Sequence, residues 1–296
     1  MMAEAAAAPK SSILLQLDVD PQPSVFDAVV AVDAGVDYLF RHGGIAPGAV
    51  RDLVHGALFT RGPADLKRTA IFVGGSDVVA AEAILEAVRA TFFAHFRVSV
   101  LLDPNGSNTT ASAAVLAALK GSGGSMEGVK AAVLGGTGPV GLRVARLLAG
   151  LGSKVSVGSR TLERSTQAAK AIENRIGRPI AAFASSSESA LIEGLAGASV
   201  VVAAGAAGVI LATESVLLRL PDLRVAIDLN AVPPPGLSWV EPTDKDTDRS
   251  GVRCWGALGV GGTKMKIHKA AIRALFESND RILDAEEILE IGRALA

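Results

Sequence analysis

The residue types best suited to chemistry are three glycines at the spacing Gly136-x-Gly138-x-x-Gly141. They follow the apolar run 131–134 and precede a segment, 140–148, whose pattern predicts a helix. A strand–turn–helix unit of this kind brings the backbone close to a pyrophosphate, whose charge the exposed amides at the helix start attract. A flexible turn is the alternative, because the chain contains 32 glycines. We expect a dinucleotide to contact Gly136, Thr137, Gly138, Pro139, Val140 and Gly141.

The end of the next predicted strand, 154–157, indicates which dinucleotide binds. It runs into Gly158-Ser159-Arg160, and no acidic residue appears before Glu163. An acidic side chain there would bind the ribose hydroxyls of NAD, whereas a hydroxyl and a guanidinium suit the 2′-phosphate of NADP. The expected cofactor is therefore NADP, with NAD as a weaker alternative. Arg164 either assists or lies on a solvated helix face, and Ala204 and Asn230, after two later strands, complete the expected cofactor-binding residues.

Composition excludes several other functions. With a net charge of -1 and 4% aromatic residues, the chain has no overall basic field and few stacking platforms for bases, so nucleic acid is not an expected partner. The longest apolar run, Val200–Ala212, is too short to span a bilayer, so no membrane association is expected. The single cysteine, Cys254, excludes internal disulfides and thiolate zinc clusters, and we expect no metal site. The alanine-rich start, residues 1–11, predicts a disordered tail without a secretory signal, so the cytoplasm is the expected location.

Alternating strand and helix patterns predict an α/β protein with two domains. Apolar runs at 13–19, 69–73 and 97–102 read as strands, with helices at 25–34 and 78–91 between them, the second capped by Ser76 or Asp77. Further strands are expected near 130–134, 154–157, 180–182, 199–203 and 224–227, which together predict a Rossmann-like, doubly wound parallel sheet. The stretch Gly121–Ser125 has the composition of a linker. The expected domains are residues 12–122, joined by about 270–296, and residues 123–269.

Polar and glycine-rich clusters follow several predicted strands, which is where open α/β sheets bind ligands. One is the segment 103–110, and another is the proline-rich loop 228–236. A third, expected to be a glycine-rich loop, covers 256–268 and brings Lys264 and Lys266.

Three segments of the chain carry a resemblance to a known family. The segments 105–111, 136–141 and 256–259, the last with Lys264, Lys266 and His268, resemble the NADP-dependent methylene-tetrahydromethanopterin dehydrogenases of methylotrophic bacteria. The resemblance runs nearly end to end and includes 23–27, 71–75 and 275–278.

The resemblance implies an amino-terminal domain, joined by the last helix of the chain, that binds a tetrahydromethanopterin-type pterin, with the active-site cleft between it and the NADP domain. It also implies a homo-oligomer. The implied reaction is oxidation of the methylene bridge to the methenyl form by direct hydride transfer to NADP, in one-carbon (formaldehyde) oxidation. Because the pterin nitrogens stabilise the cation that forms, the protein mainly has to fix the distance and angle between donor and acceptor.

The resemblance also implies site residues. It suggests Lys264, Thr110 and Asp27 as catalytic residues and Asn108, Thr109, Lys266 and His268 as substrate-binding residues. The residue types leave other roles open: Thr109 and Thr110 also suit a helix cap, Asp27 a surface helix, and His268 a packing position.

Two alternatives remain. The related folate enzyme, a methylene-tetrahydrofolate dehydrogenase joined to a cyclohydrolase, uses a tyrosine followed four positions later by a lysine. The only tyrosine here is Tyr38 and position 42 is a histidine, so a folate dehydrogenase without cyclohydrolase activity is the form left open. The other alternative is a non-catalytic NADP-sensing protein, which the fold alone does not exclude.

Overall fold

The structure, a computed structural model, describes residues 10–296, so the tail expected over residues 1–11 lies outside the described residues except for its last two. The chain forms two compact units. The first comprises the chain up to Gly106 together with His268–Asp284, and the second comprises Ser107–Ile267 together with Ala285–Ala296. None of the helices formed by residues 10–296 combines the length and apolar character that crossing a membrane requires.

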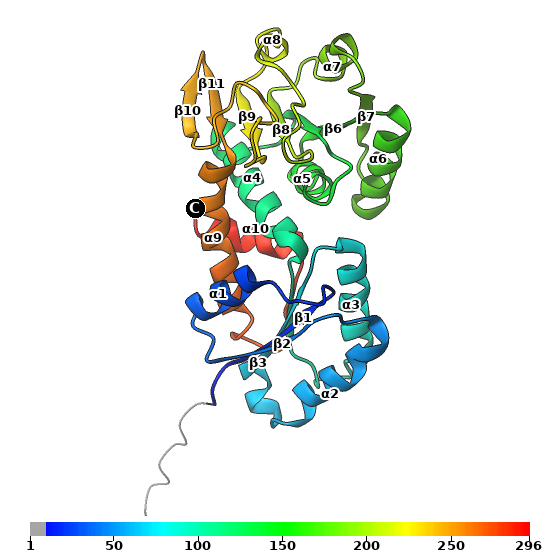
Figure 1. Ribbon diagram of the computed structural model, residues 1–296, viewed down its shortest axis with the longest axis vertical. Coiled ribbons are helices and arrows are strands. Elements are labelled where there is room, and N and C mark those ends of the chain that lie inside the picture. The colour runs from blue at the N-terminus through cyan, green and yellow to red at the C-terminus, as the bar shows by residue number, and fades with distance from the viewer. Residues whose placement is uncertain (1–9) are drawn as a thin grey trace, which may run out of the picture. The chain divides into compact units, whose positions relative to one another are not determined.

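The first unit is built on a five-stranded parallel sheet with the strand order β12-β4-β3-β1-β2. Its strands are β1 (Ile13–Asp18), β2 (Tyr38–His42), β3 (Thr69–Gly74), β4 (Ser99–Leu102) and β12 (Ile282–Leu283). Its helices are α1 (Val25–Asp33), η1 (Pro47–Ala49), α2 (Val50–Phe59), η2 (Pro63–Arg68), α3 (Val78–Thr91) and η3 (Pro104–Gly106). Figure 1 shows α1 and α3 on opposite sides of this sheet.

Side-chain alternation along β3 explains the two helical layers. Ile71 and Val73 belong to the apolar core that α2 and α3 cover, whereas Phe72 points to the other face, where its ring stacks on His268 with centroids 5.9 Å apart. The α3 start follows the expected pattern, because the Asp77 side chain accepts a hydrogen bond from the Ala80 amide.

The second unit contains a seven-stranded sheet with the order β10-β11-β9-β8-β5-β6-β7, parallel except for β10. Its strands are β5 (Lys130–Leu134), β6 (Lys154–Ser159), β7 (Ala181–Ala184), β8 (Val200–Ala203), β9 (Val225–Asp228), β10 (Lys245–Arg249) and β11 (Val252–Trp255). The order β7-β6-β5-β8-β9 is that of a Rossmann-like, doubly wound fold, as the sequence predicts. The strand order reverses between β5 and β8.

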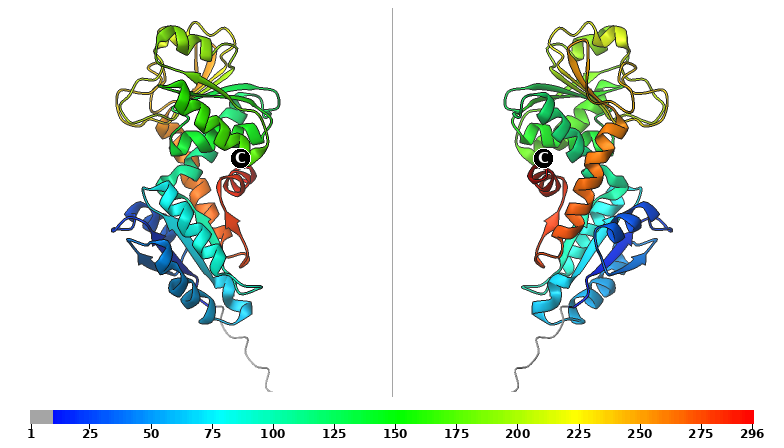
Figure 2. Two further views of the ribbon diagram at one scale, coloured as in Figure 1. Left: turned by 90° about the vertical axis from the view of Figure 1, so that its right-hand side faces the viewer. Right: turned by 90° about the vertical axis from the view of Figure 1, so that its left-hand side faces the viewer.

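Helices cover both faces of the second sheet (Figure 2). They are α4 (Ser107–Gly121), α5 (Pro139–Gly150), α6 (Leu162–Ile176), α7 (Glu188–Gly194) and α8 (Glu214–Leu217), and α10 (Ala285–Ala294) packs on α4 and α5. Helices α7 and α8 pack on the apolar face that includes Leu134, Ala203 and Cys254. Helix α9 (Ala257–Ala274) begins in this unit and ends in the first one.

The compact units differ from the expected division in two places. Helix α4 packs against α5 and β9, and α10 packs against α4 and α5, so both helices belong to the second unit rather than to the first. The glycine stretch 121–125 is therefore a turn inside that unit. A side chain on Gly121 would place its Cβ 2.5 Å from Val225 Cγ2, so this glycine is needed for close packing and not for a flexible linker.

The segment 256–268 is also not the loop that its glycines suggest, because α9 starts at Ala257. A Cβ on Gly259 would lie 1.9 Å from the Asp244 carbonyl oxygen, so this glycine lets the helix approach the turn before β10. Further along α9, Ile267, Ala271 and Ile272 are buried, which stabilises the helix through packing in spite of its glycines.

Candidate functional site

A pocket of about 540 Å³ lies at the carboxyl ends of β5, β6, β7 and β8. This is the edge of the sheet, next to the point where the strand order reverses, where doubly wound folds bind nucleotides. The lining residues are Gly135, Thr137, Gly138, Pro139, Ser159, Arg160, Arg164, Ser185, Ala204, Gly205, Ala206, Val209, Ile210 and Leu211. Thr137, Gly138, Pro139, Ser159, Arg160, Arg164 and Ala204 are expected cofactor-binding residues, whereas Gly136, Val140, Gly141 and Asn230 do not line the pocket.

The glycines of the turn after β5 have different roles. A Cβ on Gly136 would lie 2.6 Å from Val157 Cγ1, and a Cβ on Gly141 would lie 2.7 Å from the Gly135 carbonyl oxygen, so both allow the helix to pack closely on the strand. At Gly138 the nearest atom would be 3.6 Å away, which leaves the space before α5 open. Gly138 caps α5 without a side-chain hydrogen bond, so amides of the first turn face this space.

Gly135, which the spacing argument did not single out, is the most constrained glycine of this turn. Its φ is +67°, and a Cβ there would lie 2.5 Å from Gly205 Cα. The strand ends of β5 and β8 therefore approach each other with backbone alone, as the turn of a dinucleotide site requires. The residues of the pocket fit a dinucleotide at this position.

Two guanidinium groups give the pocket its charge. Arg160 follows β6, and Arg164 lies in the first turn of α6, whose start is capped by the Thr161 side chain. Both residues are exposed, and within residues 10–296 neither guanidinium has a hydrogen-bond or ion-pair partner. Because no carboxylate lines the pocket, these two charges and the hydroxyls of Ser159 and Ser185 form a site for an anion.

The apolar wall of the pocket, 204–211, is held by the loop that follows β9. The Gly236 carbonyl oxygen accepts the amide of Leu211 at 2.7 Å. The Asp228 carboxylate supports the same loop by accepting the amides of Asn230 and Leu237, each at 3.0 Å. Burial raises the pKa of Asp228, and these hydrogen bonds offset that effect only in part.

Asn230 has its side chain engaged in this loop. Its amide nitrogen donates to the Pro234 carbonyl oxygen at 2.9 Å, and its Oδ1 accepts the Val232 amide at 3.0 Å. The side chain therefore shapes the loop that supports the pocket wall.

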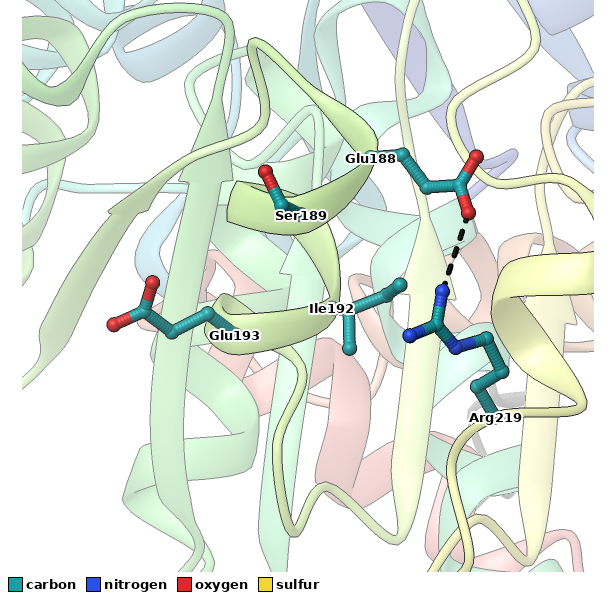
Figure 3. A pocket seen from close by; sticks show the side chains of 5 residues that line it. All are labelled: Glu188, Ser189, Ile192, Glu193 and Arg219. Carbon is teal, nitrogen blue, oxygen red and sulfur yellow. Dashed lines mark hydrogen bonds and ion pairs between the residues drawn. The ribbon is translucent and has the colours of Figure 1, made fainter.

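A second hollow of the same unit, about 480 Å³, has a different character. It lies over α7 and is lined by Glu188, Ser189, Ile192, Glu193 and Arg219. Figure 3 shows the Glu188 carboxylate reaching the Arg219 guanidinium, at 3.4 Å. Its one cation is already paired and two carboxylates line it, so this hollow does not suit a phosphate.

The residues suggested for catalysis and substrate binding fall in both units. Asp27 and His268 belong to the first unit, and Lys264, Lys266, Asn108, Thr109 and Thr110 belong to the second. His268 is fully buried, 5.9 Å from the Phe72 ring and 6.4 Å from the Phe26 ring between centroids. Lys264 and His268 are four residues apart and share one face of α9, whereas Lys266 is exposed and points away from that face.

The first turn of α4 brings Asn108, Thr109 and Thr110 together. Asn108 and Thr109 are fully buried, and the Oδ1 of Asn108 accepts a hydrogen bond from Nε of Arg143 on α5. At the start of the helix, Asn105 has φ +52°, a left-handed conformation that asparagine tolerates and that turns the chain from β4 into α4.

The first unit matches a family model. Residues 25–105 match the family described as methylene-tetrahydromethanopterin dehydrogenase, N-terminal. This range covers the first unit from α1 to η3.

Solved structures share the fold at low sequence identity. Ornithine carbamoyltransferase from Pyrococcus furiosus aligns with a TM-score of 0.60 and 12% identity, covering 92% of this chain and 86% of that one. Shikimate 5-dehydrogenase from Listeria monocytogenes, solved with shikimate and NAD, aligns with a TM-score of 0.52 and 15% identity over 97% and 96% of the two chains. Since one is a transferase and the other a dehydrogenase, the likeness establishes the two-unit α/β fold and not the reaction.

Two relatives align with almost the whole chain. The bifunctional protein MdtA of Methylorubrum extorquens is 43% identical over 284 residues, covering 96% of this chain and 99% of the relative. The NAD(P)-dependent methylenetetrahydromethanopterin dehydrogenase of the same organism is 31% identical, with the same coverage. Identity of this extent along both units shows that the chain belongs to the methylene-tetrahydromethanopterin dehydrogenase family of oxidoreductases.

Proposed function

We propose that this protein oxidises methylene-tetrahydromethanopterin to methenyl-tetrahydromethanopterin by direct hydride transfer to NADP, in one-carbon (formaldehyde) oxidation. The single observation that carries the cofactor choice is the pair of unpartnered guanidinium groups, Arg160 and Arg164, in a pocket without a carboxylate. Membership of the family carries the choice of substrate class. In this proposal the second unit binds NADP and the first contributes to binding the pterin.

The bound cofactor would supply the hydride acceptor, and the work of the chain would be positioning. The open space at Gly138 and the amides of the first turn of α5 would hold the pyrophosphate. Ser159, Arg160 and Arg164 would hold the 2′-phosphate at the other end of the pocket, and the apolar wall 204–211 would exclude water.

Lys264, Thr110 and Asp27 are proposed to contact the pterin, and Asn108 and Thr109 are proposed as further substrate-binding residues. The reaction needs little acid or base assistance, because the nitrogens next to the reacting carbon stabilise the cation that forms. These side chains would therefore raise the rate mainly by fixing the substrate at hydride-transfer distance.

The test is reduction of the nicotinamide by the purified protein, followed optically. Methylene-tetrahydromethanopterin and methylene-tetrahydrofolate are each paired with NADP and with NAD. The proposal expects the fastest turnover with the methanopterin substrate and NADP. Faster turnover with methylene-tetrahydrofolate would show that the folate, and not the methanopterin, is the preferred substrate. Cofactor binding without turnover in any of the four mixtures would favour a non-catalytic NADP sensor.

The choice of NADP makes a separate prediction at Arg160. Replacing Arg160 by alanine removes a charged hydrogen-bond donor from the 2′-phosphate, so NADP binding should weaken by about 1.5 to 3 kcal/mol and NAD binding should change little. Isothermal titration with each cofactor measures both effects. An equal loss for NADP and NAD would contradict the assignment of Arg160 to the 2′-phosphate.

A further inference from the structure

The pocket contains a polar side chain that the glycine turn and the end of β6 do not account for. Ser185 lies one residue beyond β7 and lines the pocket with Ser159, Arg160 and Arg164. We propose that the Ser185 hydroxyl donates a hydrogen bond to the 2′-phosphate of NADP and so helps the protein to select NADP over NAD. This inference rests on the proposed cofactor, and it adds a specificity-determining residue from a third element of the fold.

The sheet holds Ser185 next to the residues that bind the phosphate in the proposed complex. In the register of β6 and β7, Ser159 pairs with Ala184. Immediately beyond this pair, the Ser185 amide donates to the Ser159 carbonyl oxygen at 2.7 Å. Since neighbouring strands are about 4.8 Å apart, the backbones of Ser185 and Ser159 lie within reach of one phosphate group.

The Ser185 hydroxyl is available for a ligand. It makes no hydrogen bond to any of residues 10–296, although its residue is half-buried in the pocket. The hydroxyl of Ser187, two positions later, is in contrast engaged, because it accepts the Ala190 amide and caps α7. A free hydroxyl beside two unpartnered guanidinium groups is suited to an oxygen of a phosphate, because the phosphate accepts several donors at once.

The main competing role for Ser185 is a hydrogen bond to the adenine ring. The two roles can be separated by measuring the affinity for two fragments of NADP. A serine that binds the base contributes equally to 5′-AMP and to 2′,5′-ADP, whereas a serine that binds the 2′-phosphate contributes to 2′,5′-ADP alone.

The experiment measures binding of 2′,5′-ADP and 5′-AMP to the full chain by isothermal titration. Ser185→Ala should weaken 2′,5′-ADP about tenfold and leave 5′-AMP unchanged. Ser185→Glu, which places a negative charge beside the phosphate, should weaken 2′,5′-ADP more strongly than Ser185→Ala does. The matched control is Ser186→Ala, since Ser186 is exposed and does not line the pocket, and it should bind both ligands as the wild type does. Circular dichroism shows whether each variant is folded.

Two results would overturn the proposal for Ser185 while leaving the proposed cofactor intact: wild-type affinity of Ser185→Ala for 2′,5′-ADP, or an equal loss for both ligands. Failure of the cofactor assignment looks different, because the wild-type protein would then bind 2′,5′-ADP no better than 5′-AMP. Failure of the substrate assignment appears only in the turnover measurement and leaves these binding results unchanged.

Discussion

At the scale of single residues, function depends on whether a polar group is already paired. Arg249 forms an ion pair with Asp244, and Arg253 forms one with Asp246. Arg160 and Arg164 have no such partner among the described residues. Residue type alone does not separate these two groups of arginines. Their different roles follow from which carboxylates the fold places nearby.

The single cysteine shows the opposite case, a reactive residue type without access or activation. Cys254 is fully buried on β11, and burial, together with the nearby Asp244 carboxylate, raises the pKa of its thiol to about 12. We predict that the native protein at pH 8 reacts with no equivalent of a thiol reagent such as dithionitrobenzoate, and that denaturant releases one equivalent. Rapid reaction of the native protein would show that the thiol is accessible.

At the scale of elements, the ends of strands and helices decide where chemistry lies. The sequence predicts β5, β8 and β9 of the second unit, because they are almost fully buried and read as continuous apolar runs. It does not predict β2, whose Tyr38, Phe40 and Arg41 are exposed at the edge of the first sheet. It also treats the start of α9 as a loop, because Gly259 there is explained only by the turn against which the helix packs.

The hairpin of β10 and β11 supplies a prediction about pH. The buried Asp244 carboxylate accepts Arg249 Nε at 2.7 Å and Nη2 at 2.9 Å, and it also accepts the Glu241 amide at 2.9 Å. Burial by itself raises the pKa of Asp244, but the bonds from Arg249 and Glu241 together hold it below its ordinary value. A lowered pKa in the folded state means that the ionised group stabilises the fold above the unfolded pKa, and that this stability is lost as the pH falls.

We therefore predict that Asp244→Asn lowers the free energy of unfolding at pH 7 by about 1.5 to 3 kcal/mol, and that the difference from the wild type shrinks as the pH falls below about 4. Urea denaturation of the wild type and of Asp244→Asn, at pH 7 and at a pH below about 4, measures the difference in unfolding free energy. Asp222→Asn is the control, since Asp222 is exposed and its carboxylate has no partner among the described residues. A difference that stays constant with pH would contradict an ionised Asp244 as the source of the stability.

At the scale of the whole molecule, both units are doubly wound α/β folds, and they differ in strand order. The order β2-β1-β3-β4-β12 of the first sheet and the order β7-β6-β5-β8-β9 of the second are the two common doubly wound arrangements. The second unit carries the glycine turn and, lining its pocket, Arg160 and Arg164, so the fold provides the location and the side chains provide the specificity.

A ligand that binds the native state stabilises the whole chain, so the cofactor choice can be measured without the pterin. We predict that NADP raises the melting temperature more than NAD at equal concentration. At one hundred times its Kd, NADP should add about 2.7 kcal/mol to the free energy of unfolding. Thermal scans over a concentration series test this, with Arg160→Ala as the variant in which the difference between the two cofactors should shrink. Equal shifts for NADP and NAD in the wild type would contradict the proposal.

Local sequence by itself determined the glycine turn, the serine and arginine at the end of β6, and the individual strands and helices around them, because each depends on neighbours within a few residues. Tertiary structure decided the rest. Ser185 lines the pocket because the register of β6 and β7 sets its place, Asn230 shapes a loop through partners that its type does not reveal, and α4 and α10 join the second unit through packing. Register, hydrogen-bond partners and packing are contacts between distant segments, and the residue types of one segment do not specify which distant segment it will meet.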